Sequence, residues 1–416
     1  MQSKLLSALR RYKMVRPGDT VVCAVSGGAD SMALLWCMWL ERENLGITVE
    51  AAHFNHHLRG AESDRDEAFV REFCGRHDIP LHVGGAQVEP GKKGLEAAAR
   101  EARYAFLRSL KGTVATAHTA DDNAETVLMH LIRGTGLRGL GGITPVQPGL
   151  IRPMLDVTRA EVEAFLAENW ISHVEDSSNE SEAFLRNRVR HQVMPLLLNE
   201  NPSLPENLSA MAQRLRFDEA ALENMSQAEP DVEALRSMEP ALRRRALERF
   251  LRQNGVKEPE AKHIVQAENL VLCGNPSAYA RFPGGVILRR CYGRLEAGTE
   301  AVTLEERPLE AGESVDLPQI GLRVTCVRAE GVRGELKVRG RQPGDRITLP
   351  GGTKSLKKLL IDRKIPQHLR GAIPVVADEE GVLWVYGIGP NLARGSGVSI
   401  LFETISGEAE TIEIKK

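Results

Sequence analysis

The sequence predicts an α/β fold, with a parallel, Rossmann-like sheet first, a helical middle part next and a small α+β part last. Strand-like apolar runs alternate with helical runs between residues 20 and 133, which predicts a parallel sheet covered by helices on both faces. The length of 416 residues exceeds a single ordinary core. From about residue 300 the composition changes to short β-like runs broken by Gly and Pro. We therefore expect three domains, over residues 1–200, 201–300 and 301–416.

The composition is that of a soluble globular protein, with 42% apolar and 26% charged residues. No apolar run approaches the ~20 residues needed to cross a bilayer, and the N-terminus lacks the apolar core of a signal peptide. The six cysteines include no C-x-x-C pair, which argues against a zinc ribbon, an iron–sulfur cluster or a disulfide framework. We expect a cytoplasmic protein without a membrane part. The formal net charge of −2 excludes a globally basic nucleic-acid binder and leaves a local basic face open.

The first predicted strand, Thr20–Val25, runs into a glycine turn and then into an apolar helix that continues to about Glu43. Adjacent glycines let the main chain approach a ligand closely, and the helix directs its free N–H groups at the same turn. This arrangement is typical of a phosphate site. It is not a Walker A loop, because the Gly-Lys-Ser/Thr ending is missing, and it is not G-x-G-x-x-G. The predicted anion-binding turn consists of Ser26, Gly27, Gly28, Ala29, Asp30 and Ser31.

Three further strands and three further helices continue the alternation. In a parallel sheet, ligands bind at the carboxyl ends of the strands, and polar stretches lie after the second and fourth predicted strands. The strands are predicted at Ile47–Phe54, Leu81–Val88 and Thr113–His118, and the helices at Ser63–His77, Leu95–Leu110 and Ala120–Arg133.

The stretch after the second strand contains three histidines, His53, His56 and His57. A zinc site would need further Cys, His or carboxylate ligands at a set spacing, and none occurs locally. A polar loop that contacts the ligand is the better interpretation, with His53, Asn55 and Arg59 in the vicinity of the bound substrate.

Arg100 and Arg103 lie three residues apart on the flank of the apolar stripe of Leu95–Leu110. They read either as a solvated pair beside Glu96 and Glu101, or as two guanidinium groups that border the ligand cleft and suit phosphate or carboxylate. The residues alone slightly favour the first interpretation.

The helix predicted at Ala120–Arg133 begins with a capping pattern, since Thr119 is followed by Asp122 three residues later. Capping accounts for one or two acids and leaves the others unexplained. Asp122 and Glu125 share a helix face and could hold a metal-bound nucleotide or a cationic substrate group. His118 precedes the helix, and Arg133 starts a glycine-rich loop able to cover a site.

Two basic stretches are candidates for RNA contact. Arg186, Arg188 and Arg190 alternate along one segment and suit either a solvated helix face or an RNA backbone. Between residues 333 and 370 there are eleven Lys/Arg against three acids, a net of +8, which indicates a surface for a polyanion. The candidate contacts there are Arg339, Arg341, Arg346, Lys354, Lys357 and Lys358.

Together these stretches resemble a known family. SGGADS (Ser26–Ser31) resembles the pyrophosphate loop, or PP-loop, of the N-type ATP pyrophosphatases. Four further blocks are similar to the tRNA(Ile)-lysidine synthetases of that superfamily, in the expected order. They are HFNHHLRGAESDRDE (His53–Glu67), LEAAAREARY (Leu95–Tyr104), HTADDNAETVLMHLIRGTGLRGL (His118–Leu140) and EDSSN…LRNRVRHQVMPLL (Glu175–Leu197). VRGRQPGDRI…KSLKKLLIDRKIP (Val338–Pro366) matches the family's tRNA-binding end domain, whereas the helical middle matches only in position and character.

The resemblance implies an ATP-dependent ligase that joins L-lysine to the wobble cytidine of the isoleucine tRNA with a CAU anticodon. It would proceed through an adenylated cytidine and release AMP and diphosphate. The turn Ser26–Ser31 would then bind ATP, and Asp30 would serve Mg²⁺ and the triphosphate. Asp122 and Glu125 would hold the lysine ammonium or metal and are also candidate proton acceptors. Arg100 or Arg103 would contact phosphate during activation.

Two alternatives remain open from the sequence. A tRNA thiolase of the same fold would need a cysteine pair or a cluster held by C-x-x-C, which the chain lacks. A noncatalytic RNA-binding protein would not need to keep Asp30, Asp122 and Glu125. The sequence leaves the oligomeric state open, with a homodimer as one possibility.

Overall fold

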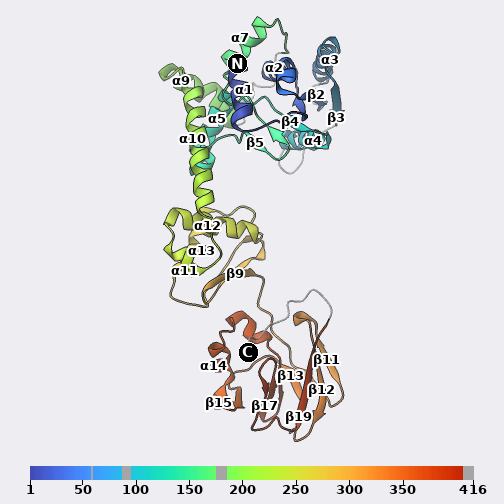
Figure 1. The fold of residues 1–416 in the computed structure, drawn as a ribbon, viewed down its shortest axis with the longest axis vertical. Coiled ribbons are helices and arrows are strands. Elements are labelled where there is room, and N and C mark those ends of the chain that lie inside the picture. The colour runs from blue at the N-terminus through green and yellow to red at the C-terminus, as the bar shows by residue number, and fades with distance from the viewer. Residues whose placement is uncertain (58–59, 87–94, 175–184, 406–416) are drawn as a thin grey trace. The chain divides into compact units, whose positions relative to one another are not determined.

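The computed structural model describes residues 1–57, 60–86, 95–174 and 185–405. The chain forms two compact units, Met1–Ala221 and Leu222–Lys416 (Figure 1). The boundary falls within one helix, α10 (Leu204–Met225). None of the helices in the described part of the chain is long and apolar enough to span a bilayer.

The first unit contains a six-stranded sheet in the order β3-β2-β1-β4-β6-β5. All neighbours pair in parallel except β5 and β6, which are antiparallel. The strand order reverses direction between β1 and β4, and ligands of such sheets bind at this switch point. The predicted parallel sheet is therefore confirmed. Its strands are β1 (Thr20–Ala24), β2 (Thr48–Asn55), β3 (Leu81–Gly85), β4 (Thr113–Ala115), β5 (Val146–Gln147) and β6 (Leu150–Ile151).

Helix α2 lies at the centre of this unit because it is apolar on almost every side. Its residues Leu34 and Met38 are fully buried, and they share one core with Val49, Ile151 and Met154 from the sheet and the loop after it. Among the other helices of the sheet region, α5 and α7 begin with threonine caps. The bounds are α1 (Gln2–Arg11), α2 (Ala29–Leu45), α3 (Ala61–Arg76), α4 (Leu95–Ser109), α5 (Ala120–Arg133), α6 (Leu137–Leu140) and α7 (Arg159–Glu168).

A helical segment with an irregular turn follows the sheet region. It begins with α8 (Leu185–Arg188), passes through a five-residue π-helical turn at Val189–Val193, and continues as α9 (Met194–Glu200). Short π-helical turns are rare and occur frequently at functional sites. Val189 and Met194 pack with Ala124 of α5 in a small core, so this segment is held against the helix that carries the predicted acids.

The second unit begins with helices, as predicted, but it also contains a sheet that the sequence analysis did not place. Residues 279–298 form a three-stranded antiparallel sheet that closes a core with α12 and α13. Its strands are only three to five residues long and rich in arginine, so their apolar alternation is weak. The elements are α11 (Val232–Ser237), α12 (Pro240–Gln253), α13 (Ala261–Leu272), β7 (Tyr279–Arg281), β8 (Ile287–Cys291) and β9 (Arg294–Gly298).

The C-terminal part is made of short antiparallel strands with one brief helix, in agreement with the predicted small α+β domain. It contains sheets of five, three and two strands. The five-stranded sheet contains β10 (Arg307–Pro308), β13 (Lys337–Arg339), β16 (Val375–Asp378), β17 (Gly381–Val385) and β18 (Gly389–Pro390). The others contain β11 (Ser314–Leu317), β12 (Leu322–Ala329) and β19 (Val398–Thr404), and β14 (Arg346–Leu349) and β15 (Gly352–Ser355), which leads into α14 (Leu356–Asp362).

We predict that Leu34→Ala destabilises the protein by about 2–5 kcal/mol, because it leaves a cavity in the centre of the first core. The matched control is Leu40→Ala in the same helix, where the side chain is 41% exposed and the expected loss is below ~1 kcal/mol. Urea unfolding followed by circular dichroism measures both. Equal losses for the two variants would contradict the central position of α2.

Candidate active site

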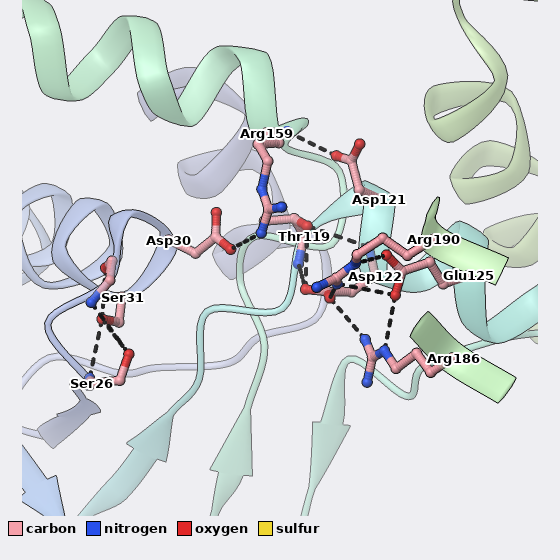
Figure 2. A network of polar contacts seen from close by, with 11 residues as sticks. Ser26, Asp30, Ser31, Thr119, Asp121, Asp122, Glu125, Arg159, Arg186 and Arg190 are labelled. Atoms are coloured by element: carbon pink, nitrogen blue, oxygen red, sulfur yellow. Dashed lines mark hydrogen bonds and ion pairs between the residues drawn. The ribbon is translucent and has the colours of Figure 1, made fainter. Parts of the chain in front are cut away.

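The turn after β1 has the geometry of an anion-binding loop. The backbone of Gly27 has a φ of +97°, which is readily adopted only by glycine. The Ser26 amide donates to Ser31 Oγ over 3.1 Å, and the Ser26 and Ser31 hydroxyls lie 3.2 Å apart (Figure 2). The residues at the two ends of the predicted motif therefore meet and close the turn. Gly28 caps α2 without any side chain, so the first helical N–H groups remain open to a ligand.

Asp30, in the first turn of α2, uses its two carboxylate oxygens differently. Oδ2 accepts a hydrogen bond from Arg159 Nη2 over 3.1 Å, whereas Oδ1 is buried with no partner among the described residues. Burial raises the pKa of Asp30, and Arg159 opposes that rise. Arg159 is fixed in turn, because its backbone N–H donates to Asp121 Oδ2 over 2.8 Å. Sequence reasoning missed Arg159, although the capping residue Thr158 before it is a recognisable signal.

The free Oδ1 of Asp30 suits a magnesium ion. Mg²⁺ is commonly bound through one or two carboxylates together with phosphate oxygens and water, and Asp30 presents one buried oxygen beside a loop shaped for phosphate. The residues present thus fit the ion that the sequence analysis expected at Asp30.

The start of α5 confirms the capping pattern and leaves one carboxylate oxygen of Asp122 for other contacts. The Thr119 backbone N–H donates to Asp122 Oδ2 over 3.0 Å, and the Asp122 N–H donates to Thr119 Oγ1 over 3.4 Å. Asp122 Oδ1 points away from the cap (Figure 2). Asp122 can therefore cap α5 through Oδ2 and still bind a cationic group through Oδ1.

Asp122 and Glu125 are both held by two arginines, Arg186 of α8 and Arg190 of the π-helical turn (Figure 2). Arg186 donates to Asp122 Oδ1 over 2.8 Å and to Glu125 Oε2 over 2.9 Å. Arg190 donates to the same two acids over 3.1 Å and 2.5 Å. Glu125 is only 3% exposed, so its charge needs such compensation. Burial alone would raise the pKa of Asp122, but Arg186 and the Thr119 amide hold this pKa below its usual value.

His118 lies between these acids and a group of arginines. Burial, together with Arg152, Arg186 and Arg100, lowers the pKa of His118 to about 4, against the opposite effect of Asp122. The imidazole is therefore neutral near pH 7, and its Nδ1 lies 3.1 Å from Thr116 Oγ1.

The predicted arginines of α4 surround one aromatic ring. The guanidinium carbons of Arg100 and Arg103 lie 5.0 Å and 5.6 Å from the centre of the Tyr104 ring. Neither arginine pairs with a carboxylate in the described part of the chain. Arg100 is exposed and Arg103 half-buried, so the choice between a solvated pair and a border of the ligand cleft stays a prediction.

The polar residues after β2 have local partners. His53 is buried, with its Nδ1 2.9 Å from the Val25 carbonyl oxygen. Asn55 donates to Asp64 over 3.1 Å and to Glu67 over 3.0 Å, which ties the strand end to α3. Arg133 is exposed at the end of α5, and Arg59 lies outside the described residues.

Pairing with acids neutralises much of the basic C-terminal segment. Arg339 forms a double hydrogen bond with Asp345 over 2.9 Å at a buried position, and Lys354 lies 3.6 Å from Asp362. The remaining candidates have no acid partner among the described residues. They are Arg341, which is half-buried, and Arg346, Lys357 and Lys358, which are exposed. The available positive charge is therefore smaller than the sequence count suggests.

Arg188 is exposed on α8.

The cysteines of the first unit lie in its apolar core. Cys23, Cys37 and Cys74 are at most 1% exposed. Burial raises the pKa of Cys37 to about 12 and that of Cys74 to about 11, and it raises the pKa of Cys23 further. These thiols are protonated and inaccessible, so they do not suit nucleophilic or cluster-binding sulfur chemistry.

Comparisons with known proteins match all three regions of the chain. Residues 1–197 match the PP-loop domain family, residues 231–296 the TilS substrate binding domain, and residues 336–394 the TilS substrate C-terminal domain. The chain is 35% identical to a tRNA(Ile)-lysidine synthase of Geobacter sulfurreducens, over 90% of each protein. It is 34% identical to the corresponding protein of Geobacillus kaustophilus, over 93% of this chain and 95% of the relative. A crystal structure of a TilS C-terminal domain is 28% identical and covers 26% of this chain and 100% of that one, with a TM-score of 0.21.

We predict that His118 stays neutral down to about pH 5 and titrates with a midpoint near 4. NMR titration of the imidazole resonances measures this, with His118→Gln used to assign the signal. A midpoint between 6 and 7, the range of an ordinary histidine, would contradict the buried, arginine-rich surroundings described above.

Proposed function

We propose, since the chain belongs to the tRNA(Ile)-lysidine synthase family, that it uses ATP to ligate L-lysine to C2 of the wobble cytidine in the CAU anticodon of tRNA(Ile). The products are lysidine, AMP and diphosphate. The change converts codon specificity from AUG to AUA and charging identity from methionine to isoleucine.

One observation supports this assignment most strongly. An acidic site made by Asp122 and Glu125 lies at the same sheet edge as the phosphate turn Ser26–Ser31, and both acids already hold cationic groups (Figure 2). A ligase that joins an amine to an ATP-activated substrate needs an anion site and an ammonium site side by side. The edge between β1 and β4 provides both.

In the first step the C2 carbonyl oxygen of cytosine attacks the α-phosphorus of ATP. A bond from that oxygen to phosphorus forms, the bond to the bridging oxygen breaks, and diphosphate leaves. The open N–H groups at the start of α2 hold the leaving group, where negative charge grows. Mg²⁺, held through Asp30 Oδ1, would add charge stabilisation at the phosphates. Arg159 keeps Asp30 oriented by its hydrogen bond to the other oxygen.

In the second step the lysine ε-amine attacks C2, the C2–oxygen bond breaks and AMP leaves. The amine must lose a proton before or during attack. Because the pKa of Asp122 is lowered by Arg186 and the Thr119 amide, against the effect of burial, this carboxylate is a weak base. It suits the binding of an ammonium group better than the removal of its proton. Asp122 and Glu125 therefore act mainly in binding and orienting lysine.

The tRNA contacts are assigned to the basic groups that remain available. Arg346, Lys357 and Lys358 are exposed and have no acid partner among the described residues, so they can neutralise phosphates without first breaking an ion pair. The thiolase alternative is not favoured, since the cysteines of the first unit are buried thiols.

The assignment is tested by incubating the full-length chain with ATP, labelled lysine and unmodified transcripts of tRNA(Ile) and tRNA(Met), both with a CAU anticodon. We expect label only in tRNA(Ile), with one diphosphate released per lysine. Asp30→Asn is the inactive control. Absence of label from every tRNA, with intact ATP binding, would overturn the proposed function.

We predict that Arg190→Gln increases the affinity for lysine by about 5-fold or more in the absence of tRNA. Lysine must take the place of a guanidinium at Asp122 and Glu125, and removal of one guanidinium leaves buried carboxylate oxygens for the ammonium. Calorimetric titration of lysine measures the affinity. Arg188→Gln, on the same segment with an exposed side chain, is the matched control. Asp122→Asn should abolish binding, and weaker binding to Arg190→Gln would refute the exchange.

We predict that replacement of both Lys357 and Lys358 by Gln weakens tRNA binding and lowers the slope of log Kd against log salt concentration by about 1–2. Fluorescence anisotropy at several salt concentrations measures this. The control is Lys337→Gln. Lys337 is already paired with Glu306 over 2.8 Å and with Glu335 over 3.0 Å, so this substitution should leave the slope unchanged. A slope that is equal in the double variant and the wild type would remove these lysines from the interface.

A further inference from the structure

The hairpin of β8 and β9 has one face in an apolar core and one face with polar side chains. Leu288 and Leu295 are at most 2% exposed and pack with α12 and α13. Side chains alternate between the two faces of a strand, so Cys291 lies on the face opposite Leu288. Cys291 pairs with Arg294, and Glu296, two residues further along β9, is its diagonal neighbour on the same face. The strand register therefore brings a thiol and a carboxylate together.

A histidine from the C-terminal part of the same unit completes the group. His368 lies in the short 3₁₀ helix Gln367–Ala372, and its Nδ1 is 3.9 Å from Cys291 Sγ. One ligand atom each of Cys291, Glu296 and His368 lies within 4.8 Å of the other two. No other three His, Cys, Asp or Glu side chains gather in this way in the part of the chain that the structure describes.

Further contacts hold the 3₁₀ helix against the hairpin. The hydroxyl of Tyr292, in the turn between β8 and β9, donates to the Ile365 carbonyl oxygen over 3.4 Å and accepts from Arg370 Nη2 over 3.3 Å. Arg370 Nε also donates to the Ile365 carbonyl oxygen over 2.9 Å. These contacts involve residues before and after His368, so its position beside Cys291 does not depend on the thiol contact alone.

The three ligand atoms suit zinc in chemistry and in spacing. Thiolate sulfur, imidazole nitrogen and carboxylate oxygen are the atoms that bind Zn²⁺ in proteins. With bonds of about 2.0–2.3 Å, the ligand atoms of a tetrahedral zinc ion are about 3.3–3.8 Å apart. The separations of 3.9 Å and up to 4.8 Å seen here need only small side-chain rotations to reach that range. Mg²⁺ and Ca²⁺ take oxygen ligands, so a site with a thiolate and an imidazole disfavours them.

Cys291 and His368 also line a cavity of about 310 Å³, which gives an ion a path to the site. A zinc ion with three protein ligands keeps its fourth position for water, and the cavity has room for it. Arg289 lies on the same wall and repels a cation. The negative charges of both the thiolate and the Glu296 carboxylate are therefore needed to hold the ion.

A Cys–His pair of this kind is alternatively a nucleophile with its base. Burial, and then Glu296, raise the pKa of Cys291 to about 12, whereas a reactive cysteine has a lowered pKa. Burial, and then Arg289, lower the pKa of His368, so its imidazole is neutral near pH 7 and its nitrogen is available to a metal ion. The surroundings thus favour ligation over nucleophilic chemistry.

We propose that Cys291, Glu296 and His368 bind a zinc ion that ties the β8–β9 hairpin to the 3₁₀ helix Gln367–Ala372. Bonds form from zinc to Sγ, Nδ1 and a carboxylate oxygen, the S–H bond of Cys291 breaks, and its proton passes to the solvent. The ion joins residues 77 positions apart in the chain. Structural zinc sites usually have four protein ligands, so with three we expect zinc that exchanges and that EDTA removes. The site is independent of the proposed ligation.

The test measures zinc on the full-length chain. The protein is stripped with EDTA under reducing conditions and dialysed against Zn²⁺, with excess Mg²⁺ present to occupy sites made of oxygen ligands alone. Metal content is then determined by plasma mass spectrometry. The variants are Cys291→Ser, His368→Gln and Glu296→Gln. The matched control is Cys273→Ser, because Cys273 is a half-buried cysteine of the same unit whose Sγ donates to the Leu270 carbonyl oxygen over 3.2 Å.

We expect one zinc ion per chain in the wild type and in Cys273→Ser. Cys291→Ser and His368→Gln should lower the zinc affinity by about 100-fold or more, and Glu296→Gln by about 10-fold. Co²⁺ in place of zinc should give a thiolate-to-cobalt charge-transfer band that Cys291→Ser lacks. A wild type without zinc, or equal zinc affinity in all variants, overturns the proposal. Because Glu296 is exposed, its variant is expected to fold normally.

Thermal melting gives a second readout that does not depend on activity. Zinc should raise the melting temperature of the wild type, since it binds the folded state, and should not raise that of Cys291→Ser or His368→Gln. A rise that persists in both variants would place the zinc elsewhere and overturn the proposal. A wild type that binds zinc at this site yet transfers no lysine would refute the proposed function alone.

Discussion

The ion-pair network of Asp122 and Glu125 with Arg186 and Arg190 is the constraint on which the active site depends. Two acids on one helix face, one of them almost fully buried, are stable only if cations neutralise them. The two arginines that do so lie more than 60 residues later in the chain. The network therefore fixes α5 against α8 and the π-helical turn that follows it. Through α5, it also positions the two acids beside the phosphate turn.

Charged side chains along this sheet edge are paired on one side and unpaired on the other. On the side of α5, cations and acids are matched, so the site can exchange one cation for another. On the side of α4 and β6, Arg103 and Arg152 have no acid partner among the described residues. An enzyme that brings a triphosphate, an RNA and an amine together needs both kinds of surface. A single cleft with averaged charge would bind each substrate less selectively.

The sequence was sufficient where the determinants are local. The alternation of runs predicted the parallel sheet, the turn Ser26–Ser31 predicted the anion loop, and Thr119 predicted the cap of α5. It was insufficient where the determinants are distant charges. Nothing near Arg186 or Arg152 in the sequence shows that Arg186 meets two acids, or that Arg152 meets none among the described residues. Arg339 is a second example, since its pairing with Asp345, six residues later, is not evident from the basic composition of the segment.

The proposed exchange of lysine for arginine at Asp122 and Glu125 has a consequence for protons. An ammonium and a guanidinium carry the same charge, so the proposed exchange leaves the net charge of the site unchanged. The proton that must be removed is the one on the substrate amine. Since His118 and Asp122 both have a lowered pKa, neither is a strong base. In the proposed reaction, the proton of the lysine ammonium therefore leaves to an acceptor other than these two side chains.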